Sequence, residues 1–248
     1  MSGKVFFVTG ASRGLGGSIT EKALAAGHCV VATARDPRAL IDLCSKHPNA
    51  LALYLDVTDE AQAHAAAMAA VERFGRIDVL VNKAGRGLLG AVEEASAAEV
   101  EALYRTNVFG LLAVTRAVLP YMRRRRAGHL VNFSSVGRCA GHAGGGVYSS
   151  TLFAVEGLSE ALALELQHLG IRVTVVELSC HRTALDTGSL AVSARTIDDY
   201  LGTSVATRSA ADGLNETRLV DPAWLADVLI KLINEPNPPA RLVLPRGR

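Results

Sequence analysis

The residues with the clearest chemical meaning form a glycine-rich turn near the amino terminus. The apolar run Val5–Val8 leads into Thr9-Gly10-Ala11-Ser12-Arg13-Gly14-Leu15-Gly16, and a helical pattern follows. A strand, a glycine turn and a helix in this order direct free backbone N–H groups and a helix dipole toward a phosphate. Gly10 permits the tight turn, Gly14 lets a pyrophosphate approach, and Gly16 lets the helix pack on the strand. The turn therefore predicts a dinucleotide site.

The end of the second apolar run indicates which dinucleotide is bound. Cys29–Ala34 is followed by Arg35, where an acidic residue would accept a hydrogen bond from a ribose 2′-hydroxyl. An arginine suits a 2′-phosphate instead, and Arg13 in the glycine turn could reach the same phosphate. Asp36 comes one residue later and keeps NAD(H) as the alternative. We expect the cofactor to be NADP(H).

Short apolar runs alternate with longer helical patterns along the chain. Seven runs are predicted to be strands: Val5–Thr9, Cys29–Ala34, Leu51–Leu55, Val79–Asn82, Leu130–Ser134, Val173–Leu178 and Arg241–Leu244. Most are continuously apolar, as strands buried on both faces of a parallel sheet should be. The alternation predicts an α/β fold, a Rossmann-like doubly wound parallel sheet of about seven strands with helices on both faces.

The length of 248 residues suits one α/β domain. We expect residues 1–248 to form a single Rossmann-type domain, with a cofactor-binding half at 1–85 and a catalytic and substrate half at 86–248. The polar segment 182–219, between the sixth strand and the last helix, breaks the regular rhythm. We predict that it is a substrate lid, because loops at this edge of a sheet commonly carry ligands; a surface insertion is the alternative.

The composition excludes several classes of partner. The net charge of +2 is too small to indicate a nucleic-acid or membrane surface. The run Arg123–Arg126 is interpreted as the solvated last turn of a helix, with a partner-binding patch as the alternative. The four cysteines show no metal-ligand spacing, which favours a reduced, cytoplasmic protein without a metal. We expect no signal peptide and no membrane span.

These features together resemble the short-chain dehydrogenase/reductase family over nearly the whole chain. The family's T-G-x-x-x-G-x-G motif is matched by Thr9–Gly16, and its N-N-A-G motif in part by Asn82-Lys83-Ala84-Gly85. Its acidic adenine contact is matched by Asp56. The residues expected to bind the cofactor are then Gly10, Ser12, Arg13, Gly14, Leu15, Gly16, Arg35, Asp56, Val57, Asn82, Ala84, Gly85 and Thr183.

The resemblance also implies catalytic roles for Ser135, Tyr148 and Asn107. In the family, the tyrosine exchanges a proton with the alcohol or carbonyl, the serine holds the substrate oxygen, and the asparagine positions a water leading to a lysine. That lysine, in Tyr-x-x-x-Lys, lowers the tyrosine pKa and bonds the nicotinamide ribose. In this chain Leu152 occupies its position. The family's Pro-Gly after the sixth strand is also missing, and Leu178-Ser179 stand there.

The missing ammonium group has a chemical consequence. A cation about 4 Å from the phenol contributes on the order of 4 kcal/mol at an effective dielectric constant of about 20. That energy corresponds to roughly three pKa units. Without it, the pKa of Tyr148 is expected to lie near its ordinary value of about 10. A neutral tyrosine can still donate a proton, so carbonyl reduction should suffer less than alcohol oxidation.

Three residues are candidates to replace the lysine. Lys83 follows the fourth strand, His142 lies in the glycine-rich loop before Tyr148, and His181 follows the sixth strand. Each has a plainer alternative, because lysines extend to solvent and most loop histidines have no catalytic task.

Three functions are consistent with these residues. The favoured one is an atypical NADP(H)-dependent oxidoreductase that reduces a ketone or oxidises an alcohol. The alternatives are a non-redox enzyme on the same frame, such as a lyase, isomerase or cyclase, and a non-catalytic NADP(H)-binding protein. The expected partner is a small-molecule substrate. Family members often pair through the helices after the fourth and fifth strands, so the resemblance implies a homodimer or homotetramer.

Overall fold

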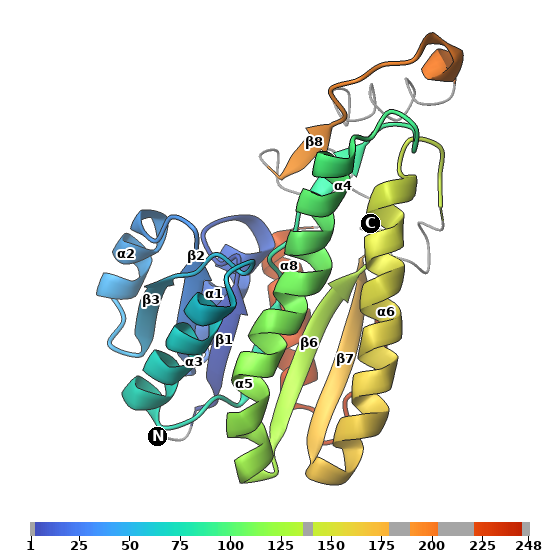
Figure 1. Cartoon of the computed structure of the whole chain (residues 1–248). Helices are drawn as coiled ribbons and strands as arrows, with labels where there is room; N and C mark the ends of the chain where they lie inside the picture. Colours follow the sequence, from blue (N-terminus) through green and yellow to red (C-terminus); the bar gives the residue numbers. More distant parts are fainter. Residues whose placement is uncertain (1–2, 136–140, 179–188, 203–220, 245–248) are drawn as a thin grey trace.

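The computed structural model describes residues 3–135, 141–178, 189–202 and 221–244, and its centre is a seven-stranded parallel sheet (Figure 1). The strand order is β3-β2-β1-β4-β6-β7-β9, which is a doubly wound arrangement. The strands are β1 (Val5–Thr9), β2 (Cys29–Ala34), β3 (Ala50–Tyr54), β4 (Val79–Asn82), β6 (Gly128–Ser134), β7 (Ile171–Leu178) and β9 (Arg241–Leu244). The Rossmann-like fold predicted from the sequence is confirmed.

Three predicted strands have different ends in the structure. The third begins and ends one residue earlier than predicted, because Ala50 already pairs with Val30 of β2. The fifth and sixth predicted strands each begin two residues earlier, since Gly128 pairs with Ile171 at the start of the β6–β7 ladder. Gly128 lies in a weakly apolar stretch that does not predict a strand. The two strands are longer than predicted because their first residues pair with each other.

Helices cover both faces of the sheet. They are α1 (Gly14–Ala25), α2 (Arg38–Ser45), α3 (Glu60–Phe74), α4 (Ala97–Tyr104), α5 (Leu111–Arg125), α6 (Gly146–Leu166) and α8 (Pro222–Asn234). The π-helical turn η1 (Arg105–Gly110) joins α4 to α5, and the short 3₁₀ turns η2 (Gln167–Leu169) and η4 (Asp198–Tyr200) complete the described helical segments. Within the described residues, none of these helices combines the length and the apolar character needed to cross a membrane.

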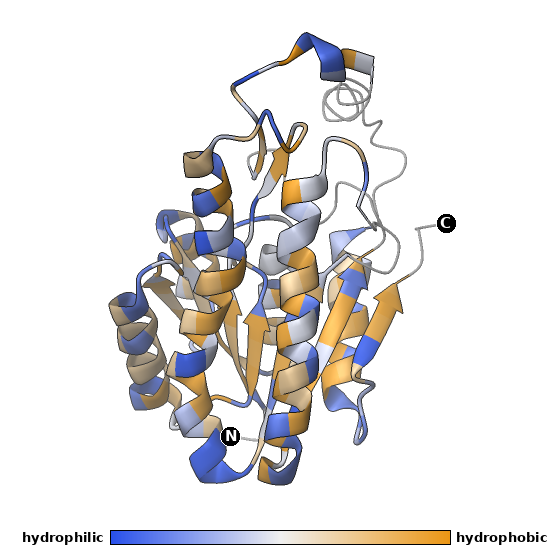
Figure 2. Cartoon of the chain, turned by 45° about the vertical axis from the view of Figure 1, so that its right-hand side comes forward, coloured by the Kyte–Doolittle hydropathy of each residue, from blue (hydrophilic) through white to orange (hydrophobic). Residues whose placement is uncertain are grey.

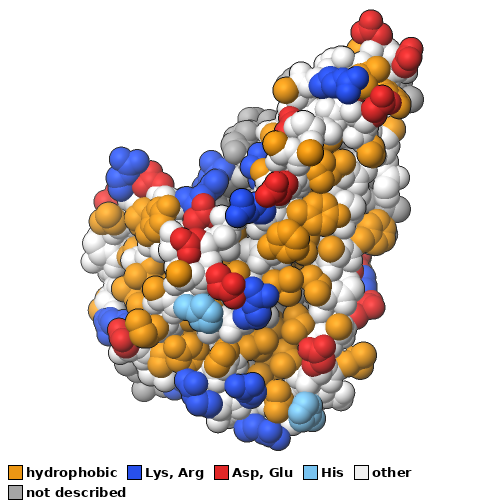
Figure 3. Space-filling view, in the orientation of Figure 1, with side chains coloured by type: hydrophobic (Ala, Val, Ile, Leu, Met, Phe, Trp, Pro, Cys, Tyr) orange, Lys and Arg blue, Asp and Glu red, His pale blue; other side chains and the backbone are white. Residues whose placement is uncertain are grey.

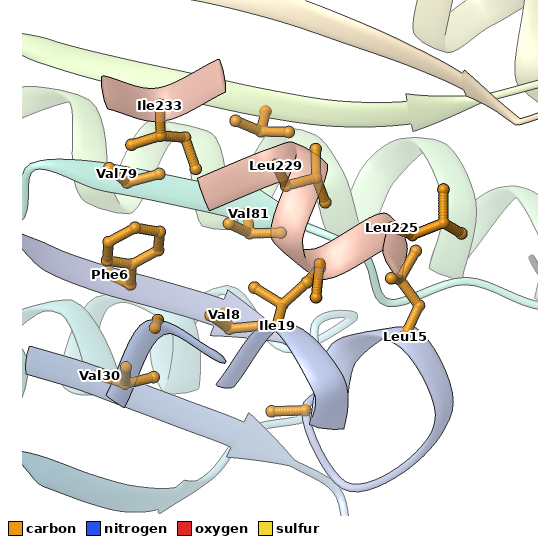
Figure 4. Packing of buried hydrophobic residues seen from close by; sticks show 14 of the residues in the cluster. Phe6, Val8, Leu15, Ile19, Val30, Val79, Val81, Leu225, Leu229 and Ile233 are labelled. Carbon is orange, nitrogen blue, oxygen red and sulfur yellow. The ribbon is translucent and has the colours of Figure 1, made fainter. Parts of the chain in front are cut away.

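The core lies in two layers, one on each side of the sheet. Phe6 and Val8 of β1 face α1 and α8, where they pack with Ile19 and Leu229 (Figure 4). The alternate residues Val5 and Phe7 face α3 and α5. Figure 2 shows mostly hydrophobic residues along the strands, as expected for strands covered on both faces.

Two helix ends follow from local sequence. Ser96 and Glu99 form a complete capping box at the start of α4, with each side chain bonded to the other residue's backbone N–H. Helix α5 ends in the arginine run, where Arg125 forms an ion pair with Asp78 at 2.7 Å. The exposed arginines there suit the negative end of the helix dipole, as predicted.

A second, two-stranded sheet projects beyond the carboxyl edge of the main sheet (Figure 1). Strands β5 (Gly87–Leu89) and β8 (Leu190–Val192) pair in parallel there. The buried carboxylate of Glu94 accepts hydrogen bonds from the backbone N–H groups of Ala91 and Ile197, at 2.7 and 3.0 Å. Residues 189–202 belong to the predicted lid 182–219, and its remaining residues lie outside the described part of the chain. The described residues 189–202 are therefore tied to the loop that precedes α4.

Candidate active site

A cleft of about 420 Å³ opens at the carboxyl ends of β1, β2 and β4. Eight residues predicted to bind the cofactor line it: Gly10, Ser12, Arg13, Arg35, Asp56, Val57, Ala84 and Gly85. Leu15 and Gly16 lie beneath it and are buried in the packing of α1 on the sheet. Thr183 and His181 lie outside the described residues. The sheet thus brings together residues from three separate predicted motifs.

The glycine turn is shaped for the close approach of a ligand. Gly10 and Gly14 have φ angles of +66° and +52°, a region that residues with a Cβ rarely adopt. A Cβ on Gly16 would lie 2.1 Å from the carbonyl oxygen of Gly10, so only glycine allows α1 to pack this closely. Helix α1 begins at Gly14 with no side-chain cap, which leaves its first N–H groups available to an anion.

Thr9 connects the glycine turn to the loop after β4. Its hydroxyl oxygen accepts hydrogen bonds from the backbone N–H groups of Lys83 and Ala84, both at 3.0 Å. The same hydroxyl donates to the carbonyl oxygen of Val81 at 3.2 Å. Two walls of the cleft are therefore held in one fixed relation. Asn82 instead points between strands and donates to Asn132 (2.9 Å).

The charged residues after β2 differ in their availability to a ligand. The carboxylate of Asp36 accepts two hydrogen bonds from the guanidinium of Arg38, at 2.9 and 2.7 Å. This pairing lowers the pKa of Asp36 to about 2. Arg35 is exposed and, among the residues that the structure describes, its guanidinium has no ion pair or hydrogen bond. The acid beside the cleft is occupied, whereas the arginine is free to bind an anion.

Asp56 is placed to accept a hydrogen bond from a base. Its Oδ1 accepts from the backbone N–H and the hydroxyl of Thr58, at 2.9 and 2.8 Å. Its Oδ2 has no partner within the described part of the chain. With the uncapped helix start and the free Arg35, the cleft fits a ligand that carries a pyrophosphate, an amino-bearing base and a further phosphate.

A second, smaller cavity of about 50 Å³ contains the predicted catalytic residues. Ser135, Tyr148 and Asn107 line it, together with Leu152 and Leu178. The segment 83–86 lines both this cavity and the larger cleft, so the two spaces adjoin along one loop. The three predicted catalytic residues, which come from different parts of the chain, therefore meet beside the larger cleft.

The phenol of Tyr148 is strongly biased toward its neutral form. Burial raises its pKa to about 12. The ordinary value of about 10 expected from the sequence is therefore too low, because the phenol is desolvated as well as deprived of a cation. Leu152 is buried in the same cavity, beside Val155 and Phe133, and an apolar wall stands where the family has an ammonium group.

Ser135 and Asn107 are both bonded to the protein. The Ser135 hydroxyl donates to the carbonyl oxygen of Leu178 at 2.6 Å. The Asn107 side chain accepts from the N–H of Arg86 at 2.9 Å and donates to the carbonyl of Arg86 at 2.8 Å. It also donates to the hydroxyl of Thr151 on α6 at 3.1 Å. Asn107 sits in the π-helical turn η1, a type of distortion that frequently marks functional sites.

Two candidates to replace the lysine can be placed. Lys83 is half-buried and belongs to the loop that lines both the cleft and the small cavity. His142 is exposed and does not line either space. Its imidazole lies against Gly145, where a Cβ would be 2.2 Å from the ring. Of these two residues, only Lys83 therefore lies beside the cavity that contains Tyr148 and stays a candidate to replace the lysine.

Sequence reasoning missed two parts of the site. Arg86 lines both spaces. Ser189, Leu190 and Ala191 belong to the predicted substrate lid, but they form a wall of the larger cleft, where the cofactor is expected. The guanidinium of Arg13 donates to the hydroxyl of Ser189 at 2.9 Å, which joins the glycine turn to the start of the segment 189–202. The signal for Arg86 was its place directly after the Ala84-Gly85 pair; nothing in the sequence indicates the contact between Arg13 and Ser189.

Comparison with known proteins agrees with this fold. A family model described as short chain dehydrogenase matches residues 4–191. The chain is 34% identical over 242 residues to the 3-ketodihydrosphingosine reductase of Bacteroides thetaiotaomicron, covering 97% of this chain and 87% of that protein. The chain belongs to the short-chain dehydrogenase/reductase family of oxidoreductases.

Two solved structures are similar over almost the whole chain. A short-chain dehydrogenase from Streptomyces avermitilis has a TM-score of 0.89 and 41% identity, covering 98% of this chain and 88% of that one. A metagenomic short-chain oxidoreductase in complex with NADP has a TM-score of 0.79 and 26% identity, covering 100% of this chain and 99% of that one.

Proposed function

We propose that this protein is an NADP(H)-dependent oxidoreductase that favours the reduction of a ketone over the oxidation of an alcohol. The observation that carries the proposal is the small cavity with Ser135 and Tyr148, which adjoins the dinucleotide cleft along residues 83–86. Two relatives support it, since one is named 3-ketodihydrosphingosine reductase and another was solved in complex with NADP.

The preference for NADP(H) rests on the residues after β2. Arg35 is available for a 2′-phosphate, whereas both carboxylate oxygens of Asp36 accept hydrogen bonds from Arg38. An engaged carboxylate is a poor acceptor for the ribose 2′-hydroxyl of NAD(H). The uncapped start of α1 would hold the pyrophosphate, and Asp56 Oδ2 would accept from the adenine amino group.

The preference for reduction rests on the protonation of Tyr148. When bound, the reduced dinucleotide supplies a hydride to the carbonyl carbon. Tyr148 remains protonated at neutral pH, because burial raises its pKa to about 12, and it donates the proton that the substrate oxygen needs. Ser135 orients that oxygen after its hydroxyl turns from the carbonyl of Leu178. The reverse reaction needs an ionised phenol, which is scarce here.

The contacts of residues 189–202 support the predicted lid. Ser189 accepts a hydrogen bond from Arg13, and the N–H of Gly87 donates to the Ser189 carbonyl at 2.8 Å. A lid anchored on both the glycine turn and the β5 strand would cover the junction of cleft and cavity. We therefore retain the proposal that residues 182–219 close over the substrate.

Exposed apolar side chains support self-association. Phe109, Phe153 and Leu164 are 56%, 50% and 76% exposed, and they belong to η1 and α6. Figure 3 shows hydrophobic side chains gathered over the end of α4 and the start of α5. We propose that these helices pair with a second copy, as the family resemblance implies.

A non-redox enzyme is the second candidate, and Leu152 is the observation that favours it. The experiment that separates the two adds NADPH to the purified protein with a panel of ketones and follows absorbance at 340 nm. Ketone-dependent loss of NADPH is the expected result. Tight NADPH binding with turnover of a substrate at constant absorbance would contradict the oxidoreductase and support the non-redox enzyme; binding without any turnover would indicate a binding protein.

A further inference from the structure

Arg86 is held in place through its backbone. Its N–H and C=O groups both bond to the side-chain amide of Asn107, at 2.9 and 2.8 Å. The same amide donates to Thr151 on α6, one turn of helix away from Tyr148. Two elements, η1 directly and α6 through Asn107, therefore hold the backbone of Arg86 in place. A side chain that starts from a fixed backbone loses less freedom when it binds a ligand.

Within the part of the chain that the structure describes, the guanidinium of Arg86 has no partner. The residue is half-buried, and among the described residues its side chain has no ion pair and no hydrogen bond. Of the two acids that line the cleft, Asp36 pairs with Arg38, and Asp56 accepts hydrogen bonds from Thr58 through one oxygen; among the described residues neither bonds to the Arg86 guanidinium. Partial burial of an unpaired charge is unfavourable, so it indicates a site whose anion comes from outside the chain.

The location of Arg86 narrows the choice of ligand. Arg86 lines the dinucleotide cleft and also the cavity that holds Tyr148 and Ser135. Arg13 also lines the cleft, and the positive charges of both arginines raise the potential for an anion there. A planar guanidinium can donate two parallel hydrogen bonds to two oxygens of one oxyanion, and both a phosphate and a carboxylate offer such a pair of oxygens.

We propose that Arg86 anchors an oxyanion of a ligand, a phosphate or a carboxylate, at the junction of the cleft and the small cavity. The inference rests on the proposed function, since the anion belongs either to the dinucleotide or to a carbonyl substrate that carries a carboxylate. In the first case Arg86 strengthens cofactor binding by sharing the pyrophosphate with the start of α1. In the second case it selects 2-oxo acids over neutral ketones.

The test compares Arg86→Met, Arg86→Lys and Arg123→Met with the wild type. Arg86→Met removes the charge and keeps an apolar stem, whereas Arg86→Lys keeps a charge and loses the paired geometry. Arg123→Met removes the same charge from the exposed end of α5, at the opposite edge of the sheet, and serves as the matched control. Calorimetry measures the binding of inorganic pyrophosphate, of NADP⁺, and of pyruvate in the presence of NADP⁺.

We expect Arg86→Met to weaken at least one probe about tenfold or more, which is the typical scale for a lost charge-assisted hydrogen bond. Arg86→Lys should lie between Arg86→Met and the wild type, and Arg123→Met should match the wild type. If Arg86→Met weakens the binding of pyrophosphate and NADP⁺, the anion belongs to the cofactor. A loss confined to pyruvate assigns it to the substrate.

The inference is wrong if Arg86→Met binds every probe as tightly as Arg123→Met, or if the wild type binds none of them. Thermal unfolding checks that each variant is folded. If Arg86→Met does not fold, the comparison is made with Arg86→Lys instead. A wild type that binds NADP⁺ but never oxidises NADPH with any ketone would overturn the proposed function. The anion site would then still be tested by the NADP⁺ and pyrophosphate arms.

Discussion

The two ends of the dinucleotide cleft differ in how closely they keep the family's pattern. At the end expected to hold the adenine and the phosphates, residues of the glycine turn, Arg35 and Asp56 all line one cleft. At the nicotinamide end, Leu152 replaces the lysine and the phenol of Tyr148 has a pKa of about 12. The first end depends on backbone shape, and the second depends on one charged side chain. Binding of the dinucleotide can therefore persist while the chemistry changes.

The largest expected effect comes from the adenine and phosphate end. In Gly16→Val, the new side chain would begin 2.1 Å from the Gly10 carbonyl oxygen and displace the turn. We expect NADP⁺ binding to fall at least a hundredfold, a loss of about 3 kcal/mol, as measured by calorimetry. Gly17→Ala is the control, because the nearest atom to its Cβ is at an ordinary 3.5 Å. Equal binding by Gly16→Val and Gly17→Ala would show that the turn does not hold the phosphates.

The pH dependence of the wild type examines the nicotinamide end. Alcohol oxidation needs ionised Tyr148. At pH values below the tyrosine pKa, the ionised fraction rises about tenfold for each unit by which the pH increases. With a pKa of about 12, the oxidation rate should climb without a plateau between pH 7 and 10. Ketone reduction uses the neutral phenol and should not fall over this range through ionisation of Tyr148. A plateau of the oxidation rate near pH 7 would mean that another cation acts on the phenol.

Restoring the cation should narrow the difference between the two ends. Leu152→Lys places an ammonium group in the apolar wall beside Tyr148, which should lower the tyrosine pKa and raise neutral-pH oxidation about tenfold or more. Leu152→Met keeps the size and adds no charge, so it should behave as the wild type. The measurement is the pH profile of oxidation for all three proteins. An unchanged profile in a folded Leu152→Lys variant would indicate a rebuilt site.

Smaller effects are expected at the cofactor's 2′ position. Arg35→Ala should weaken NADP⁺ by about tenfold and leave NAD⁺ unchanged, because only the former carries a phosphate there. Arg38→Ala releases Asp36 from two hydrogen bonds, so NAD⁺ binding should improve a few-fold. Titrations with NADP⁺ and NAD⁺ measure the ratio of the two dissociation constants for each variant. If Arg35→Ala weakens both cofactors equally, Arg35 does not recognise the 2′-phosphate.

The strands and the glycine turn could be predicted from the sequence because their signals are local. Continuous apolar runs specify strands buried on both faces, and Gly10, Gly14 and Gly16 specify a turn next to a helix. The replacement of the lysine by Leu152 could also be seen directly, since it lies four residues after Tyr148. Such features depend on residues that are neighbours in the chain, and the tertiary structure changed only their ends.

The rest of the site was decided by contacts between distant residues. Asn107 binds Arg86 across 21 positions, Ser135 binds Leu178 across 43, and Arg13 binds Ser189 across 176. The pKa of Tyr148 likewise depends on which side chains exclude water from the phenol, and no spacing reports that. The sequence by itself determined the fold and the frame that holds a dinucleotide, because local pattern and backbone shape suffice for both. Only the tertiary structure decided which charges remain free inside that frame, because pairing and burial are properties of the packed chain.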